Sequence, residues 1–150
     1  MGREIRRVPQ DWQHPKDRHG NYRAMYDIPY RTAADEWIAN FEAWRRGETP
    51  HGSLDDFLYA YSPPYAETFR EREWTPEEAT HYQIYETVSE GTPVSPVFAT
   101  TDEMRAWLID QGHSERAADG FIRTGWVFSA LFTSSGITMG IDSYDALPDA

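Results

Sequence analysis

Residues 82–88 read YQIYETV, and residues 100–112 read TTDEMRAWLIDQG. In the first stretch, even-numbered side chains point to one side and odd-numbered ones to the other, a period of two that predicts a strand. In the second, apolar residues recur at helical spacing between an N-cap at Thr100 and a stop at Gly112. A strand and a helix that follow one another this closely are typical of an α+β protein.

The sequence around these two stretches predicts further short elements. Residues 89–93 read as a turn and 94–98 as a second strand, which Pro96 confines to a sheet edge. A second helix is expected to begin after Ser114 and to end at Gly125. Residues 126–133 and 137–141 then read as two strands of a hairpin, joined by a Ser-Ser-Gly turn at 134–136.

Two more helices are expected upstream. One begins at Thr32, whose hydroxyl can cap the helix, and carries the apolar stripe Trp37, Ile38, Phe41 and Trp44 before Gly47. A shorter one follows Ser53 and ends before Pro63. The predicted fold is therefore α+β: a single compact domain of about four helices with short antiparallel hairpins and an extended N-terminal arm.

Charge divides the 150-residue chain at residue 31. Residues 1–31 hold seven basic and four acidic residues, and they are rich in Pro, Gly, Asp and Asn, which predicts a basic extended arm that packs on the body or reaches from it. Residues 32–150 hold seven basic and 21 acidic residues and are expected to form an acidic α+β domain. A body this acidic repels a phosphate backbone but attracts a basic protein surface.

Several classes of protein are excluded or disfavoured by simple counts. The chain has no cysteine, so it has no disulfide, thiolate nucleophile or Cys-ligated zinc, and this fits a cytoplasmic location in a host cell. We expect no membrane association, because the N-terminus lacks the apolar region of a secretory signal and no apolar run is long enough to span a bilayer.

Catalytic patterns are equally scarce. The five histidines lack the helical spacing of a zinc site and are expected to be solvated or structural. No Gly-x-Ser-x-Gly or phosphate-binding loop occurs. The best remaining acid/base pair is His81 with Glu78 or Glu86. We therefore expect no catalytic residues, no metal and no cofactor, and the chain is predicted not to be an enzyme.

Two groups of residues are candidates for contact with a partner. One lies in the turn after the strand, where hydroxyls and carboxylates stand between prolines: Glu86, Ser89, Glu90 and Thr92. The same residues could instead only stabilise the turn. The other combines aromatic and acidic residues near Pro63, which would suit an arginine-rich surface: Asp55, Asp56, Tyr59, Tyr61, Tyr65 and Glu67.

The run ETVSEGTPVSPVFAT at 86–100, with EMRAWL at 103–108, resembles a family of small uncharacterised proteins encoded by bacteriophages and prophage-like elements. The opening GREIRRVP at 2–9, with Trp12 and His14-Pro15, is similar to the start of that family. The resemblance covers about a quarter of the chain. It implies a mobile-element origin and supplies no catalytic residues.

Together these observations predict a phage or mobile-element encoded interaction protein. It would bind and inhibit a host nucleic-acid-handling defence complex of the anti-CRISPR or other anti-defence type, by nucleic-acid mimicry. The expected partner is a host protein or ribonucleoprotein complex with a basic surface, without direct binding of nucleic acid. Two alternatives stay open: a small accessory enzyme or ligand-binding domain that uses the 86–95 loop, and a virion or assembly component.

Overall fold

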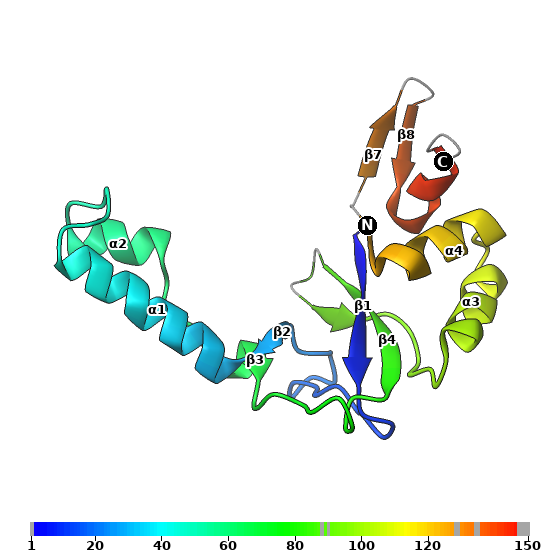
Figure 1. Ribbon diagram of the computed structural model, residues 1–150, viewed down its shortest axis with the longest axis horizontal. Helices are drawn as coiled ribbons and strands as arrows, with labels where there is room; N and C mark the ends of the chain where they lie inside the picture. The colour runs from blue at the N-terminus through cyan, green and yellow to red at the C-terminus, as the bar shows by residue number, and fades with distance from the viewer. Residues whose placement is uncertain (1, 88, 90, 128–129, 134–135, 147–150) are drawn as a thin grey trace. The chain divides into compact units, whose positions relative to one another are not determined.

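The structure is a computed structural model that describes residues 2–87, 89, 91–127, 130–133 and 136–146 (Figure 1). Its four helices and small sheets confirm the α+β class. The contacts divide the chain into two compact units rather than one: unit 1 joins Met1–Ala24 to Trp74–Ala150, and unit 2 is Met25–Glu73. The division therefore does not follow the change of charge at residue 31.

Unit 1 is built on a four-stranded sheet of order β5-β4-β1-β6. β1 (Arg3–Val8) pairs antiparallel with β4 (His81–Glu86) along its whole length, and its first residues also pair with β6 (Trp126–Val127). The expected N-terminal arm thus begins as an inner strand. The pairing of these residues was not predicted, because the partners that complete a strand lie far away in the sequence and leave no local pattern.

Two helices cover one face of this sheet: α3 (Thr101–Asp110) and α4 (Glu115–Thr124) (Figure 1). As predicted, the side chains of Thr100 and Ser114 cap them by accepting hydrogen bonds from backbone N–H groups. Gly125 ends α4 in the left-handed conformation, with φ of 72°. The core lies between helices and sheet and contains Ile84, Phe98, Met104, Leu108, Ala117, Ala118, Phe121 and Ile141.

The edge of the sheet beyond β4 is shorter than predicted. β5 is only Thr92–Pro93, and the expected strand at 94–98 makes a single further bridge, from Phe98 to Tyr82. Between them, the Ser95 hydroxyl accepts the N–H of Ile84. A side chain therefore takes the place of a backbone acceptor at this point, and the regular pairing of the edge is interrupted.

The predicted C-terminal hairpin is present in part. β7 (Ala130–Thr133) pairs with β8 (Gly136–Met139), and Ser134 and Ser135 of its turn lie outside the described residues. Trp126–Val127, expected in the same strand as residues 130–133, belongs to the main sheet instead. The 3-10 helix η2 (Gly140–Ala146) follows the hairpin.

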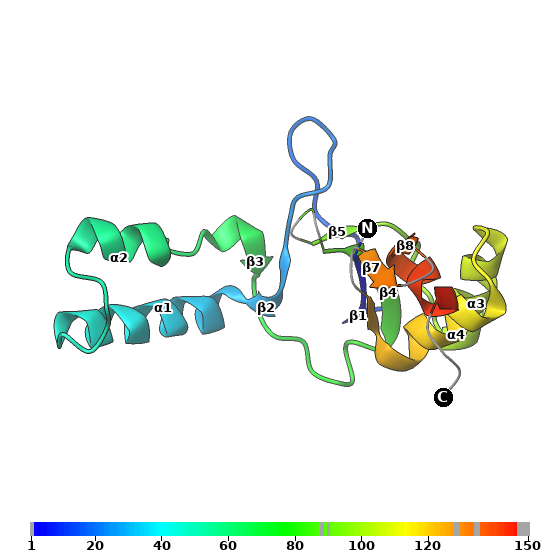
Figure 2. The same ribbon diagram turned by 90° about the horizontal axis from the view of Figure 1, so that it is seen from above.

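Unit 2 is a helical hairpin with a small parallel sheet. α1 (Tyr30–Arg45) and α2 (Leu54–Ala60) lie side by side (Figure 2), and β2 (Tyr26–Pro29) pairs with β3 (Phe69–Arg70), which follows the 3-10 helix η1 (Ala66–Thr68). α1 begins two residues before Thr32, directly after Pro29, so the predicted cap at Thr32 does not form. Ser53 caps α2 as predicted.

Phe57 of α2 is the centre of packing in unit 2. It is fully buried, and its ring lies within 6.0 Å of the rings of Trp37, Phe41 and Trp44 on α1. Ile38, which was expected on the same stripe, is 52% exposed because its position points about 100° away from that of Trp37 on a helix.

Because the two units have separate centres of packing, we expect truncations to act on one unit at a time. Phe57→Ala should lower the stability of unit 2 by about 3–5 kcal/mol, and backbone hydrogen exchange should accelerate within residues 25–73. Leu108→Ala is the matched change in the core of unit 1, and it should accelerate exchange in β1, β4 and α4. Equal acceleration in both units for either variant would contradict the division.

Candidate functional site

The sheet face that does not meet α3 and α4 carries buried polar side chains. The register pairs Arg6 with Gln83 on this face, while Ile5 and Ile84 on the opposite face join the apolar core. Arg6 is 6% exposed and Gln83 is 7% exposed. Buried charges and amides need hydrogen-bond partners, so this face has to be covered by groups that bond to it.

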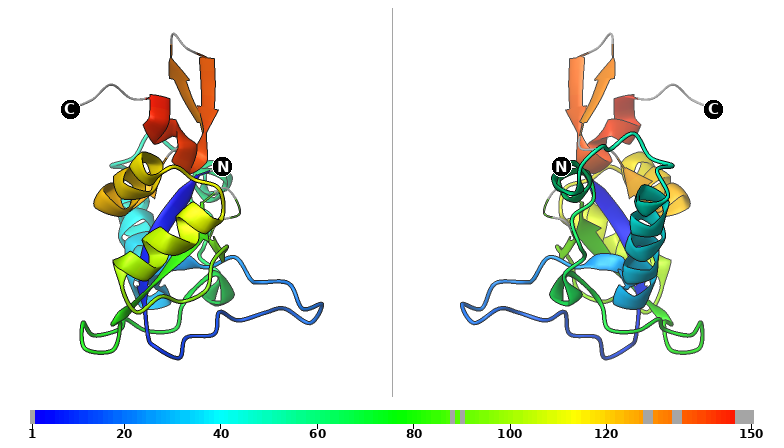
Figure 3. Two further views of the ribbon diagram at one scale, coloured as in Figure 1. Left: turned by 90° about the vertical axis from the view of Figure 1, so that its right-hand side faces the viewer. Right: turned by 90° about the vertical axis from the view of Figure 1, so that its left-hand side faces the viewer.

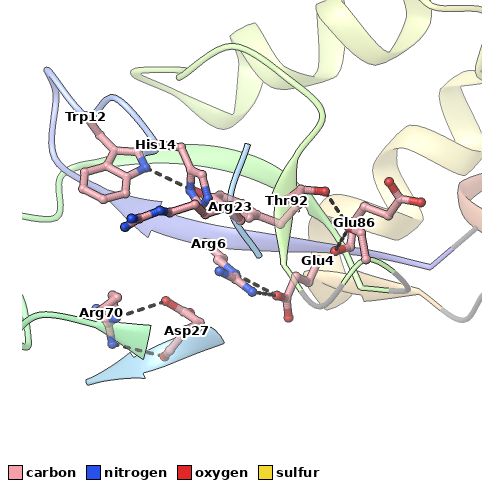
Figure 4. A network of polar contacts seen from close by, with 11 residues as sticks. Glu4, Arg6, Trp12, His14, Arg23, Asp27, Arg70, Glu86 and Thr92 are labelled. Atoms are coloured by element: carbon pink, nitrogen blue, oxygen red, sulfur yellow. Dashed lines mark hydrogen bonds and ion pairs between the residues drawn. The ribbon is translucent and has the colours of Figure 1, made fainter. Parts of the chain in front are cut away.

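Residues 9–24 form a long loop after β1 (Figure 3). Two of its side chains, Trp12 and His14, supply part of this cover. Trp12 Nε1 donates to the Tyr85 hydroxyl at 2.9 Å (Figure 4). His14 Nδ1 lies 2.9 Å from the same hydroxyl, and His14 Nε2 lies 2.6 Å from the carbonyl oxygen of Arg23. The Tyr85 hydroxyl therefore joins two side chains of the loop to the sheet.

Arg6 lies against the other side of this network. Its guanidinium is 4.2 Å from the centroid of the Tyr85 ring and forms a 2.6 Å ion pair with Glu4 (Figure 4). The ion pair and the aromatic face together offset the loss of water around a buried cation. The network thus holds a cation without leaving it unpaired.

Burial lowers the pKa of His14 below its ordinary value of 6.5; its hydrogen bond to Arg23 raises the pKa, and the nearby Arg6 lowers it further. His14 is therefore neutral at pH 7. Since a carbonyl oxygen can only accept, Nε2 carries the proton and donates to Arg23, and Nδ1 accepts from the Tyr85 hydroxyl. Each polar hydrogen in this chain of contacts has one acceptor.

A cavity of about 620 Å³ lies beside the network in unit 1. Its wall comes from the 9–24 loop, β4 and the segment after β5: Trp12, Gln13, His14, Pro15, Lys16, Tyr22, Gln83, Ser95, Pro96 and Val97. Gln83 Nε2 donates to the Ser95 carbonyl at 2.9 Å, but Gln83 Oε1 is buried and accepts no hydrogen bond from any described residue. Such an unpaired acceptor costs about 1–3 kcal/mol.

The predicted contact residues in the 86–92 turn bond mainly to one another. Glu86 lies 3.8 Å from Arg3 in an ion pair, and the hydroxyls of Ser89 and Thr92 form a hydrogen bond. Ser89 also donates to the carbonyl of Glu86. Glu90 lies outside the described residues. The contacts of the other three residues are those of a strand-turn-strand corner, and a role in binding stays a prediction.

The second predicted group lies in unit 2, on α2 and the segment after it. Tyr59 is 93% exposed and Tyr65 is 74% exposed. Tyr61 is less free, because its ring stacks on Phe57 with centroids 5.3 Å apart and its carbonyl accepts from Trp37 Nε1. The acidic members of the group are all exposed: Asp55, Asp56 and Glu67. This group and the 86–92 turn belong to different units.

The predicted acid/base pair is not assembled among the described residues. His81 Nδ1 lies 2.9 Å from the hydroxyl of its neighbour Thr80. Glu78 accepts from the backbone N–H of Thr75, and Glu86 pairs with Arg3. Within the described ranges, no three histidine or acidic side chains gather as they would around a metal ion, and no helix has the length and apolar character needed to cross a membrane.

The cavity residues were not predicted as a site. His14 was expected to be solvated or structural, and the structure buries it in the polar network. The useful signal was Gln83, an amide in the strand predicted at 82–88 and two residues before the aromatic Tyr85. What covers that face could not be seen, because residues 9–24 are distant in sequence and irregular.

The lowered pKa of His14 predicts a pH dependence of stability. As pH falls below about 6.5, the unfolded chain takes up a proton at this residue before the folded chain does, so stability is lost with a slope of up to about 1.4 kcal/mol per pH unit. Urea unfolding at pH 7.5 and 5.5 should show that His14→Gln removes this slope. The exposed His19→Gln should keep it, and an unchanged slope in His14→Gln would contradict the assignment.

The comparisons with known proteins return no match. No protein-family model, no curated protein and no solved structure matches the chain. The resemblance to phage-encoded proteins therefore stays a prediction that rests on residues 2–15 and 86–108.

Proposed function

We propose that this protein acts by binding a partner with a basic, arginine-rich surface, and that α2 of unit 2 is its main contact. The observation that carries the proposal is the distribution of exposed apolar side chains. Among the described residues, nine large hydrophobic side chains are exposed, and all except Tyr22 belong to unit 2. Exposed aromatic residues that gather in one region are typical of binding surfaces.

The construction of unit 2 explains why these side chains stay exposed. Within α1 and α2, only Ala33 and Phe57 are buried, and of these two only Phe57 is completely so. A pair of helices has one shared interface, and Phe57 fills it. Leu54, at 45% exposed, and Tyr59 therefore remain accessible on α2. A larger partner could cover them and gain the free energy of burying apolar surface.

Charge indicates what kind of partner fits. Unit 2 holds ten acidic and five basic residues. Four of the basic residues form ion pairs within the unit: Arg31, Arg45, Arg46 and Arg70. On α2, however, the side chains of Asp55 and Asp56 form no hydrogen bond or ion pair with any described residue. The surface of α2 is thus negative as well as aromatic.

Asp55 and Tyr59 stand one helical turn apart, so they share one face of α2. An arginine of a partner could meet the carboxylate with its N–H groups and the ring with its flat face. Lysine lacks the planar group, which favours arginine as the complementary residue. Nucleic acid itself would be repelled by the same carboxylates.

The resemblance to phage-encoded proteins extends this proposal to a biological role. A negative, aromatic surface could occupy the basic channel of a host nucleic-acid-handling defence complex and exclude its nucleic acid. The net charge of −14 over residues 32–150 supports such mimicry. The mechanism would require no catalysis by the chain.

A direct test measures binding of a fluorescent nona-arginine peptide to the full chain by anisotropy. We expect binding at low salt that weakens steeply as salt rises, because opposite charges are screened. Asp55→Asn with Asp56→Asn should weaken it about tenfold, and Tyr59→Ser should weaken it about threefold.

A matched control removes two exposed carboxylates from unit 1, Glu77→Gln with Asp110→Asn, and leaves unit 2 unchanged. This variant has the same net charge as the α2 double variant. If peptide binding is weakened to the same extent in both double variants, the affinity depends only on the total charge of the protein, and α2 is not the contact surface. Circular dichroism should show both variants folded, since these changes affect only exposed side chains.

A further inference from the structure

We infer that the β7–β8 hairpin is the surface through which two copies of this chain associate, by antiparallel pairing of β7 with β7 of a second copy. The two hairpins would then form one sheet, in the order β8-β7-β7-β8. The hairpin lies in unit 1, so this surface is separate from α2 and does not depend on the function proposed for it.

The hairpin is a sheet of only two strands. β7 and β8 pair with each other, and within the described ranges neither of them pairs with the main sheet or with any other strand (Figure 1). The 3-10 helix η2 contacts both strands but adds no strand to them. A sheet of two strands is marginally stable in water, and further strands stabilise it. A second copy would supply them.

The register shows which backbone groups form the free edge of β7. Thr133 pairs with Gly136, and these two residues flank the turn. Residues that flank a two-residue turn hydrogen-bond to each other, and such pairs alternate with pairs that do not. The N–H and C=O groups of Ala130 and Phe132 therefore point away from β8, where a further strand can bond to them.

The sequence of the hairpin indicates a second copy as the partner. Residues 124–141 are the longest stretch without a charged residue, in a chain of which 26% of the residues are charged. Two copies that each carry a net charge of −11 repel one another where their charged surfaces meet. The uncharged hairpin is the segment at which they can approach with the least repulsion. In a two-fold arrangement each β7 both donates to the other and accepts from it.

The free edge also lacks the residues that prevent pairing between edge strands. Exposed edges are usually protected by charged residues or proline. The main sheet follows this rule, because its outer segment beyond β4 carries Pro93 and Pro96. Residues 124–141 contain neither a charged residue nor a proline. The hairpin is thus the less protected of the two edges.

Glycines favour β7 over β8 as the strand that pairs. β8 begins at Gly136, and the chain leaves the extended conformation directly after it, at Gly140 with φ of 57°. Glycine weakens strand pairing because it has no side chain to pack and loses more freedom. β7 contains no glycine.

A lipid bilayer is disfavoured as the partner of this uncharged segment. The open edges of the hairpin would find no hydrogen-bond partner in hydrocarbon. The negative charge of the rest of the chain would also be repelled by anionic lipids.

Sedimentation velocity of the full chain at about 5–500 µM should show a monomer–dimer equilibrium. A rise in sodium chloride from about 0.05 to 0.5 M should tighten the dimer about threefold or more, because salt screens the repulsion between the copies. The same rise should weaken binding of the arginine peptide, so the two proposals can fail independently. A monomer at both salt concentrations would overturn the inference, and so would a monomer that floats with phosphatidylcholine vesicles.

Two proline variants test which edge pairs. Ala130→Pro removes an outward N–H of β7 without removing a bond to β8, and it should weaken the dimer about tenfold. Ile137→Pro is the matched change at the edge of β8 and should leave the dimer unchanged. The opposite result would contradict pairing through β7.

Cysteine variants give a second test, because the chain has no cysteine of its own. When two β7 strands overlap fully, the two Leu131 residues occupy opposite positions of a non-hydrogen-bonded pair, with Cα atoms about 4.5 Å apart. A disulfide can span that distance. Leu131→Cys should therefore form a covalent dimer on mild oxidation, whereas Thr138→Cys, at the paired position of β8, should not. Absence of the covalent dimer in Leu131→Cys would overturn the inference even if the proline variants failed to fold.

Discussion

The hydroxyl of Tyr85 is the contact on which the arrangement of unit 1 depends. It accepts from Trp12 and donates to His14, and so ties an irregular loop to the inner strand β4. The same strand turns Ile84 into the apolar core under α3 and α4. Side chains alternate between the two faces of a strand. Because one face of β4 packs in the apolar core, its polar side chains lie on the other face, where they need hydrogen-bond partners. The attachment of the loop to the sheet, the burial of Arg6 and the position of the cavity all follow from this need for partners.

The parts of the structure that could be predicted are the local ones. The caps at Ser53, Thr100 and Ser114 depend on residues three positions apart, and all three form as expected. The inner position of β1 could not be predicted, since its partners are β4 and β6. The cap at Thr32 failed because Pro29 allows the helix to start earlier. Local chemistry predicts where elements begin, but not which elements meet.

The two candidate sites also differ in how far they could be predicted from the sequence. Exposure of Tyr59 and Tyr65 could be anticipated, because aromatic residues beside prolines and carboxylates are poorly placed for a core. The cavity could not be anticipated, because it joins a loop near residue 12 to an amide at residue 83 and a turn at residue 95. The two units therefore present two kinds of surface, one open and negative, the other hollow and lined by flat rings.

The long separation in sequence between β1 and β6 also affects how the chain folds during translation. Glu4 stands opposite Trp126 in the finished sheet, so β1 leaves the ribosome long before its second neighbour exists. Unit 2, in contrast, is one uninterrupted segment and can assemble while synthesis continues. Until translation reaches residue 127, the nascent chain carries in β1 a strand with an unpaired edge, the kind of segment that chaperones shield from aggregation.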